Sequence, residues 1–396
     1  MSIETAADRD AAFLAGITEL ADAVAAIHAP DVDDHARFPA EALDALREQR
    51  ALSAMVPTEL GGGGVSLRAV ALACFELGRR CGASAMVFAM HQIQVATIVR
   101  HLDGEADDSF FHDYLRELVA NQRLIASVTS EVGTGGDMSR SIAAVVPAGD
   151  GRATFEKQAP TVSYGAYADD LLTTLRNSPD AEAGEQVVAL TRADQVRLEP
   201  KGTWDPLGMR GTCSPGYVVH AEFALEQVLA TPFSTIAPET MVPVSHILWS
   251  HLWLGIATDA FDRARAFVRA AARQKPGEPI PAALKLSHVM TQLSLLRAEV
   301  RSALEEFLEA DADPGRERLS TLAMSLRFNN LKLAASEQAP LVCMGAMGVC
   351  GIVGFKNDTP FSIGRHLRDS MSASLMIAND RIHQTNAGLL LIAKDV

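Results

Sequence analysis

The residue pattern of this 396-residue chain changes character twice. Up to about residue 124, apolar residues recur at the three-to-four spacing of amphipathic helices, as in "FPAEALDALREQRAL". From there to about residue 230, short β-type runs such as "QVVALTRA" alternate with Gly, Pro, Asp and Asn, which suggests a compact β-barrel or sandwich. Helical patterns then return. A β-module between two helical blocks is an uncommon order, and it limits the folds open to the chain.

The expected elements follow from this order. Helices are predicted at 5–28, 39–53, 67–80 and 83–102, and, after the β-module, at 245–274, 282–308, 316–336 and 366–393. We therefore expect a mostly α-helical fold with an inserted β-domain. The predicted domains are an N-terminal helical domain over 1–124, a middle β-barrel domain over 125–235 and a C-terminal helical domain over 236–396.

The formal net charge is −14 and the sequence pI is about 5.2. No basic run offsets this balance, which opposes binding to nucleic acid or to an anionic membrane. The acidic start "MSIETAADRD" lacks the features of a signal peptide, and no stretch long enough to span a bilayer is apolar throughout, so we expect no membrane association. The five cysteines are odd in number and lack CxxC spacing, which indicates reduced thiols and a cytoplasmic protein.

The stretch "SVTSEVGTGGDMSR" (127–140) places three glycines within four positions, Gly133, Gly135 and Gly136. A Walker loop would need Gly-Lys-Ser/Thr, and a dinucleotide fingerprint should open a helix. Here "DMSRSIAAVV" leads into a strand instead. On local evidence, a tight turn between strands explains the cluster as well as a cofactor site does.

The other chemistry-bearing residues give no decisive motif. The eleven histidines show no metal-ligand spacing, and GxSxG is absent. His91 lies in an apolar helical pattern, where a lone histidine is more often a satisfied core residue than a functional one. Arg265, Arg269 and Arg273 share one helical face, which a solvated stripe explains.

Taken in order, several segments resemble the acyl-CoA dehydrogenase superfamily of flavoproteins. Residues 38–92, which begin "FPAEALDALREQRAL" and end "FAMHQ", are similar to its N-terminal pattern. "VTSEVGTGGD" (128–137) resembles the signature T-E-P-x-A-G-S-D, and "KGTWDPLGMRGTCSPG" (201–216) resembles K-x-G-W-x-x-x-x-L-G-x-R-x-T-x-S. "RQKPGEPI" (273–280) stands where the family has R-x-x-F-G, and "RHLRDSMSASLMIANDRI" (365–382) where it has a final R-D helix. The resemblance covers nearly the whole chain.

This resemblance implies a flavin between the β-domain and a C-terminal four-helix bundle. FAD is the expected form, and FMN is less favoured. The backbone around Val128, Thr129 and Ser130 would approach the flavin. Ser163 matches a hydroxyl residue that hydrogen-bonds the flavin ring, and Thr161 stands where the family has a tryptophan that shields it.

The resemblance also implies a homotetramer or a dimer of dimers. Arg273 matches the arginine that pairs with the FAD pyrophosphate of a partner chain, where a guanidinium suits a phosphate. Gly345 lies in "CMGAMG", a segment that contacts FAD in the family, but the family's glutamine there is replaced by Val342.

The departures from the family concern the reaction itself. Family dehydrogenases use a glutamate to remove the α-proton of an acyl thioester. The commonest position of that glutamate aligns with Ile377, and its alternative position aligns with Ser245. Asp380 is the nearest carboxylate, but on a continuous helix it would point about 60° away from Ile377.

Two substrate positions differ as well. The signature serine that contacts the thioester ligand becomes Gly136, and an arginine near the CoA adenine becomes His246. Together with Ser245 and Ile377, these are the candidate substrate-contacting positions. The scaffold resembles a flavin enzyme whose acyl-CoA chemistry has been altered.

Three functions remain open from the sequence. The first is dehydrogenation of an acyl thioester of CoA or a carrier protein, or of a similar small molecule, by a non-standard base such as Asp380, with an electron-transfer flavoprotein as partner. The second is a flavin-dependent monooxygenase, supplied by a flavin reductase, with Ser163, His91 and His383 as catalytic candidates and Thr161 leaving room beside the flavin. The third is a non-catalytic subunit of a heteromeric acyl-CoA dehydrogenase.

Overall fold

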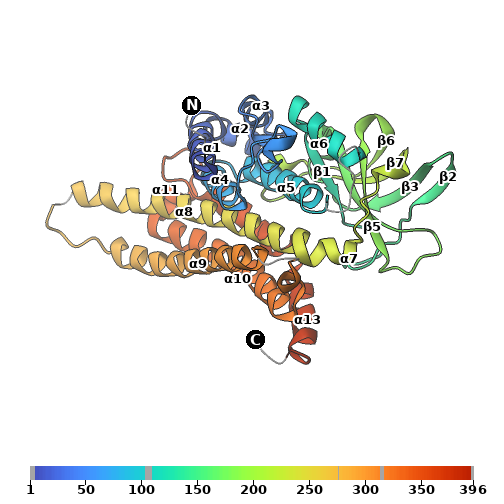
Figure 1. Ribbon diagram of the computed structural model, residues 1–396. Helices are drawn as coiled ribbons and strands as arrows, with labels where there is room; N and C mark the ends of the chain where they lie inside the picture. The colour runs from blue at the N-terminus through green and yellow to red at the C-terminus, as the bar shows by residue number, and fades with distance from the viewer. Residues whose placement is uncertain (1–4, 103–108, 275, 313–315, 394–396) are drawn as a thin grey trace.

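The computed structural model describes residues 5–102, 109–274, 276–312 and 316–393. The predicted order of helices, strands and helices is confirmed (Figure 1). The N-terminal helices are α1 (Ala6–Leu20), α2 (Ala26–Asp34), α3 (Ala40–Glu48), α4 (Leu67–Arg80), α5 (Gly82–Val99) and α6 (Phe110–Asn121). The C-terminal helices are α7 (Phe233–Ile236), α8 (Val242–Gln274), α9 (Ala282–Asp311), α10 (Leu322–Cys350), α11 (Ile352–Phe355), α12 (Gly364–Met371) and α13 (Asn379–Leu390).

The strands between these blocks form two sheets. They are β1 (Ile125–Val128), β2 (Val146–Gly149), β3 (Arg152–Ala159), β4 (Asp170–Arg176), β5 (Gln186–Arg192), β6 (Val196–Lys201) and β7 (Gly216–Ala224). The first sheet has the order β1-β4-β5, with β1 and β4 parallel. The second has the order β2-β3-β7-β6 and is antiparallel throughout. Alternate residues of β3 are buried, as expected of a strand with one solvated face.

Helix α8 is the axis of the fold. In Figure 1 it runs from the β-domain to the opposite tip of the molecule, with the N-terminal helices on one side and α9 and α10 on the other. Its first half is buried on all sides, because it packs against α4, α5, α9 and α10. Glycines permit a close approach to α4, since a Cβ on Gly78 would stand 2.4 Å from the carbonyl oxygen of Leu252.

The structure corrects two of the expected helices. Helix α10 ends at residue 350 rather than 336 and contains Pro340. The expected continuous helix over 366–393 is split into α12 and α13 by residues 372–378, where Ile377 has a φ of +50°. The buried amine of Lys332 donates to the Ile377 carbonyl oxygen at 3.1 Å and to Asn379 Oδ1 at 2.6 Å. A side chain from α10 thus stabilises a turn where the sequence alone continues a helical pattern.

By length and composition alone, three described segments are apolar enough to cross a membrane: Ala6–Asp34, Gly82–Val99 and Leu322–Cys350. This corrects the expectation that no segment has this property. Gly82–Val99 is helix α5, and 89% of its apolar stretch is buried inside the fold, so packing accounts for its composition.

Candidate active site

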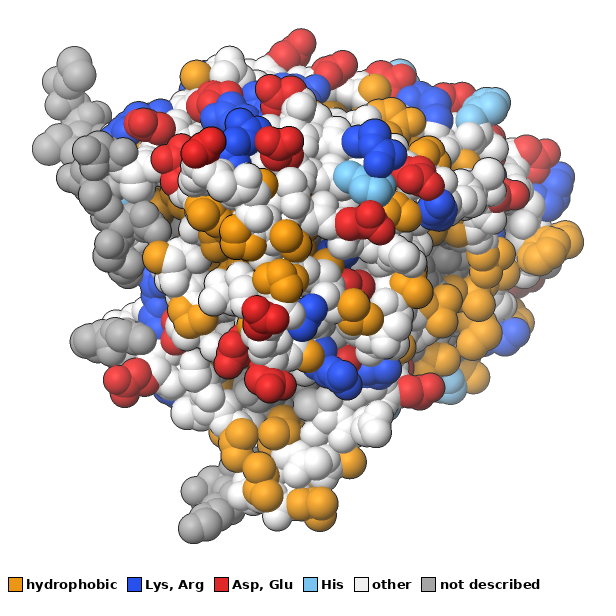
Figure 2. Space-filling view, turned by 90° about the vertical axis from the view of Figure 1, so that its right-hand side faces the viewer, with side chains coloured by type: hydrophobic (Ala, Val, Ile, Leu, Met, Phe, Trp, Pro, Cys, Tyr) orange, Lys and Arg blue, Asp and Glu red, His pale blue; other side chains and the backbone are white. Residues whose placement is uncertain are grey.

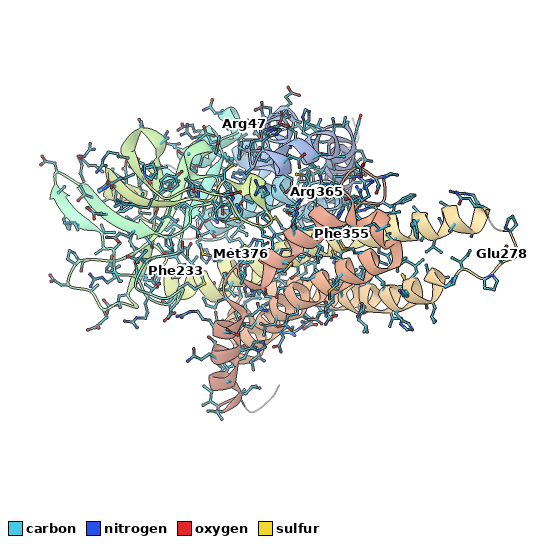
Figure 3. The ribbon with its side chains drawn as sticks, turned by 180° about the vertical axis from the view of Figure 1, so that it is seen from behind. Arg47, Phe233, Glu278, Phe355, Arg365 and Met376 are labelled. Atoms are coloured by element: carbon cyan, nitrogen blue, oxygen red, sulfur yellow. The ribbon has the colours of Figure 1, made fainter. Side chains whose placement is uncertain are left out.

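A cavity of about 760 Å³ opens where the β-domain meets the helices. Its lining comes from α5, the π-helical turn Ala237–Met241, the start of α8, the loops after β1 and β3 and before β7, and residues 371–378. Met376, labelled in Figure 3, belongs to the last of these segments. The volume is typical of small-molecule sites, so this cavity is the candidate active site.

The β-domain contributes a group of hydroxyls to the cavity. We call these six residues the hydroxyl wall: Thr129, Ser130, Thr161, Ser163, Thr212 and Ser214. Ser214 Oγ lies 3.0 Å from Ser163 Oγ and 2.9 Å from Thr212 Oγ1, so the three hydroxyls form a hydrogen-bonded chain. Ser130 Oγ donates to the carbonyl oxygen of Thr161 at 2.9 Å. The wall offers donors and acceptors to the polar edge of a ligand.

The glycine cluster forms part of the same cavity. Gly135 and Gly136 line it with φ angles of +62° and +84°, which glycine adopts without strain. The loop is braced by the buried carboxylate of Glu131, which accepts hydrogen bonds from Ser141 Oγ at 2.8 Å and from the two following backbone N–H groups at 3.0 and 2.7 Å. The glycine cluster therefore lies in a loop that hydrogen bonds to Glu131 stabilise, beside a ligand cavity.

The guanidinium of Arg381 lies directly against this loop. A Cβ on Gly135 would stand 2.5 Å from Arg381 Nη2, and a Cβ on Gly136 would stand 3.5 Å from its Nε. Arg381 belongs to the first turn of α13, lines the cavity and is half-buried. Within the described part of the chain its side chain makes no hydrogen bond or ion pair, and its charge acts on the carboxylate of Asp137, which lines the same cavity.

Methionines dominate the apolar part of the cavity. Of the 13 in the chain, seven line it, so much of this surface is unbranched and able to change shape. Six of them come from outside the glycine loop, and we call these the methionine wall: Met86, Met90, Met209, Met241, Met371 and Met376. Trp204 and Trp249 add two indole rings to the lining.

Asp137 is the one carboxylate among the described residues that line the cavity. Its Oδ1 accepts a hydrogen bond from the Ser139 N–H at 3.0 Å and one from the Ser139 hydroxyl at 2.6 Å. Burial alone would raise the pKa of Asp137, but these hydrogen bonds and the charges of Arg381 and Arg140 lower it below its usual value. Asp137 is therefore ionised and weakly basic.

The R-D motif joins α12 to the β-domain at the edge of the cavity. Arg368 forms a bidentate ion pair with Asp33. The buried carboxylate of Asp369 accepts a hydrogen bond from the Met209 N–H at 2.6 Å, and burial raises the pKa of Asp369 to about 6. A Cβ on Gly208 would stand 2.0 Å from the Arg368 carbonyl oxygen, so only glycine permits this approach.

The structure brings seven of the predicted site residues together at the cavity: Thr129, Ser130, Gly136, Thr161, Ser163, Ser245 and Ile377. The side chain of Val128, at the end of β1, is fully buried in the core. The hydroxyl of Ser245 donates to the Val242 carbonyl oxygen at 2.9 Å. The two positions where the family has its base therefore carry an apolar side chain and an engaged hydroxyl.

His91 lies outside the cavity lining and is fully buried. Its Nδ1 accepts a hydrogen bond from the Ile125 N–H at 3.1 Å, which leaves its Nε2–H to donate to the Leu52 carbonyl oxygen at 2.7 Å. Burial lowers the pKa of His91 to about 4. Both ring nitrogens thus connect α5 to the neighbouring backbone, which is the role of a structural core histidine.

Three other predicted residues also lie away from the cavity lining. His246 is buried, with Nδ1 3.0 Å from the Phe328 carbonyl oxygen, and burial lowers its pKa to about 3. His383 is exposed on α13, 3.6 Å from Glu337 Oε1. Asp380 is exposed in the first turn of α13. The angular argument for Asp380 is wrong, because the helix on which it rested is interrupted at Ile377.

The remaining cofactor positions are distant or engaged. Arg273 is exposed in the last turn of α8, 28 residues beyond Ser245, which corresponds to about 42 Å along a helix. In Figure 3, Glu278, in the turn after α8, lies at one tip of the molecule, whereas Met376 of the cavity lies near its middle. Gly345 contacts α9, where its Cβ would stand 2.8 Å from Val289 Cγ2. In a single chain, neither position reaches the cavity.

Sequence reasoning missed Arg381 and the methionine wall. Arg381 follows Ile377 by four residues, inside a segment already matched to the family, so its position was a usable signal. The six methionines are spread over nearly 300 residues and share no motif. Only the fold places them on one surface.

The family model for "Acyl-CoA dehydrogenase, N-terminal domain" matches residues 7–106. Cyclohex-1-ene-1-carbonyl-CoA dehydrogenase of Syntrophus aciditrophicus is 23% identical over 376 residues, which are 91% of this chain and 84% of that protein. Amino sugar nitrososynthase DnmZ of Streptomyces peucetius is 26% identical over 87% of this chain and 84% of its own length.

Among solved structures, FMN-bound TdsC, a dibenzothiophene monooxygenase from Paenibacillus sp. A11-2, superimposes with a TM-score of 0.80. The two sequences are 21% identical, and the superposition covers 96% of this chain and 97% of TdsC. The two proteins therefore share a fold. The N-terminal family match and the relatives that align over most of the chain bear out the predicted resemblance to the acyl-CoA dehydrogenase superfamily of flavoproteins. The solved structures show that the fold is shared over nearly the whole chain.

Proposed function

We propose that this chain is a flavin-dependent oxidoreductase that oxygenates a small molecule. The observation that carries this proposal is the character of the cavity lining. In the described chain its one carboxylate is Asp137, whose lowered pKa makes it a poor acceptor for a carbon-bound proton. Dehydrogenation of an acyl thioester needs a good base at this place, and oxygenation by reduced flavin does not.

The described residues fit a flavin. A flavin is a broad planar ring system with polar atoms along one edge, and the cavity combines a hydroxyl wall with a large apolar surface. Ser163 is suited to the polar edge, because its hydroxyl ends the hydrogen-bonded chain through Ser214 to Thr212. FMN-bound TdsC supports this reading by likeness.

When bound, reduced flavin supplies two electrons to O2, so that one oxygen atom enters the substrate and the other leaves as water. The chain's own residues bind and enclose the reactants. The hydroxyl wall orients the polar edge, and the methionine wall excludes water from the reacting centre. A flavin reductase is the proposed partner that regenerates the reduced flavin.

FAD and FMN differ in whether their binding would need a contact from a second subunit. The expected FAD would need Arg273 of a second subunit for its pyrophosphate, because Arg273 is about 42 Å along α8 from Ser245 of its own chain. FMN would need no such contact. Arg273→Ala separates the two, since it should weaken FAD binding at least tenfold if the family contact is present and leave FMN binding unchanged.

The experiment compares two reactions of the flavin-loaded protein. We expect its yellow colour to persist on anaerobic mixing with a panel of acyl-CoAs. With NADH and a flavin reductase, we expect the colour to bleach and O2 to be consumed in the presence of substrate. Bleaching by an acyl-CoA alone would overturn the proposal. A protein that remains colourless after incubation with either flavin would show a non-catalytic subunit.

Dehydrogenation of an acyl thioester is the second candidate. It is supported by the cyclohex-1-ene-1-carbonyl-CoA dehydrogenase relative, which matches 91% of the chain. In this case Asp137 would have to remove the proton, and an electron-transfer flavoprotein would accept the electrons. Asp137→Asn should then abolish reduction of the flavin by an acyl-CoA.

A further inference from the structure

We infer that the substrate is a planar, largely apolar molecule with one anionic group, which the guanidinium of Arg381 binds. This inference rests on the proposed function, because it names the substrate class of the same cavity. It is carried by two separate observations. One is the placement of Arg381 on the glycine loop, and the other is the methionine wall.

The glycine loop leaves space for the guanidinium. Arg381 Nη2 lies 2.5 Å from where a Cβ on Gly135 would stand, a distance that real side chains do not tolerate. Positive φ angles at Gly135 and Gly136 bring the backbone into this position. The glycines therefore do more than turn the chain, since they admit a positive charge to the cavity wall.

The charge of Arg381 is available to a ligand. Arg368, the other arginine that lines the cavity, is already held by Asp33 in a bidentate pair. Arg381 has no such bidentate partner within the described residues: its charge acts on Asp137 without a hydrogen bond, and Asp137 Oδ1 accepts its hydrogen bonds from Ser139. A guanidinium in a largely apolar cavity binds a carboxylate, sulfonate or phosphate group through charge-assisted hydrogen bonds.

The methionine wall indicates the rest of the substrate. Thioether side chains have no branch at Cβ, adapt to the shape of a ligand and make favourable contacts with aromatic rings. Five of them, with Trp249, come from the helical blocks, and Met209 comes from the loop before β7. An aliphatic CoA chain would not need such polarizable partners. A flat aromatic ring system would make the most favourable contacts with this surface.

The same guanidinium chemistry would also suit the phosphate of the flavin, so the experiment separates the two sources of the anion. The probes are 2-naphthoate and its neutral analogue 2-naphthamide, which share size and shape. Isothermal titration calorimetry measures the binding of both to the flavin-free and the flavin-loaded protein. Flavin affinity is measured in parallel for every variant.

We expect 2-naphthoate to bind at least tenfold more tightly than 2-naphthamide. Arg381→Met should remove this preference and leave the affinities for 2-naphthamide and for flavin within about twofold. Arg269→Met, at an exposed site on α8, is the matched control and should change nothing. Arg381→Lys should retain part of the preference, because the charge remains but the bidentate geometry is lost.

A second test changes the loop instead of the arginine. Gly135→Ala should displace the guanidinium and reduce the preference for 2-naphthoate, whereas Gly133→Ala should preserve it, because a Cβ there would meet Ile142 rather than Arg381. Three results would overturn the inference: no preference in the natural protein, an equal loss for both probes in Arg381→Met, or a loss of flavin affinity in its place. None of these depends on turnover, so a failure of the proposed oxygenation is recognised separately.

Discussion

The carboxylate of Asp369 accepts a hydrogen bond from the backbone N–H of Met209, and this contact joins α12 to the loop before β7 at the edge of the cavity. Asp369 belongs to the R-D motif, and Met209 belongs to the segment "PLGMRGT". The two family-like segments are 160 residues apart. Their structural role is to fasten the β-domain to the C-terminal helices, which fixes the shape of the cavity.

Asp369→Asn should gain stability relative to the natural protein as the pH rises. The folded pKa of about 6 lies above the ordinary 3.8, so the folded state holds the proton more tightly than the unfolded chain does. Burying the carboxylate therefore costs up to about 3 kcal/mol above pH 6 and nothing below about pH 4. Urea unfolding of both proteins at pH 4.5 and 7.5 measures this. A variant equally destabilised at both pH values would contradict the prediction, and Asp358→Asn at an exposed site is the control.

Gly208→Ala should weaken the same junction. The added methyl group would stand 2.0 Å from the carbonyl oxygen of Arg368, which the surrounding backbone cannot accommodate without moving. We expect a loss of roughly 2 kcal/mol or more in the free energy of unfolding. The matched control is Gly348→Ala on α10, where a Cβ meets no atom within 4 Å and helix propensity should raise stability slightly. Equal effects of the two changes would refute this account.

Ser163→Ala should reduce flavin affinity about five- to tenfold, in keeping with the loss of one hydrogen bond to the ligand. Ser245→Ala is the control, because the Ser245 hydroxyl already donates to the Val242 carbonyl oxygen and should not contribute to binding. Flavin fluorescence titration measures both. If Ser245→Ala proved the more damaging change, the assignment of the polar flavin edge to the hydroxyl wall would be wrong.

His91→Leu should destabilise the fold without changing the activity of the folded fraction. It leaves the Ile125 N–H and the Leu52 carbonyl oxygen without their partner, which costs about 2–4 kcal/mol near neutral pH. Because the pKa of His91 falls from 6.5 to about 4 on folding, its contribution is present above pH 6.5 and declines as the pH falls towards 4. The melting temperatures of the natural protein and of His91→Leu should therefore differ less at pH 4.5 than at pH 7.5. Loss of turnover with unchanged stability would instead make His91 catalytic.

Lys332→Met should loosen the turn between α12 and α13 while leaving global stability nearly unchanged. Burial lowers the pKa of Lys332 to about 8, which shows that its charge is poorly solvated, so replacement by a thioether of similar length removes that penalty. The carbonyl oxygen of Ile377 and the side chain of Asn379 lose their donor. Hydrogen exchange of residues 375–379 should accelerate at least tenfold, and it should not do so in Lys285→Met, at an exposed site on α9.

Exposed apolar residues remain at the end of the C-terminal helix. Helix α13 lies at the lower end of the molecule in Figure 1, where Figure 2 shows hydrophobic side chains. Near the end of this helix, Leu390, Leu391 and Ile392 are 54%, 88% and 65% exposed. The predicted homo-oligomer offers a reason for such residues, and sedimentation of the natural protein at several concentrations would test it. The oligomeric state stays a prediction.

Local patterns determined most of the architecture. The period of the apolar residues gave the helix–β–helix order, because amphipathic helices and half-buried strands impose different spacings on any chain that buries them. The same reasoning failed at 366–393, where the helical pattern continues through Ile377. The break there depends on Lys332, which is 45 residues away in the sequence and invisible to any local rule.

The residue pattern by itself determined the fold class, and the resemblance of its segments to a known family placed the glycine loop and Ser163 among the ligand-contacting candidates. The tertiary structure decided what surrounds them. It moved His91 into the core, left His383 and Asp380 at the surface and brought Arg381 against Gly135. The physical reason is that a binding site is a set of distances between side chains on different elements, whereas the residue pattern along a chain records only which face of each element is buried.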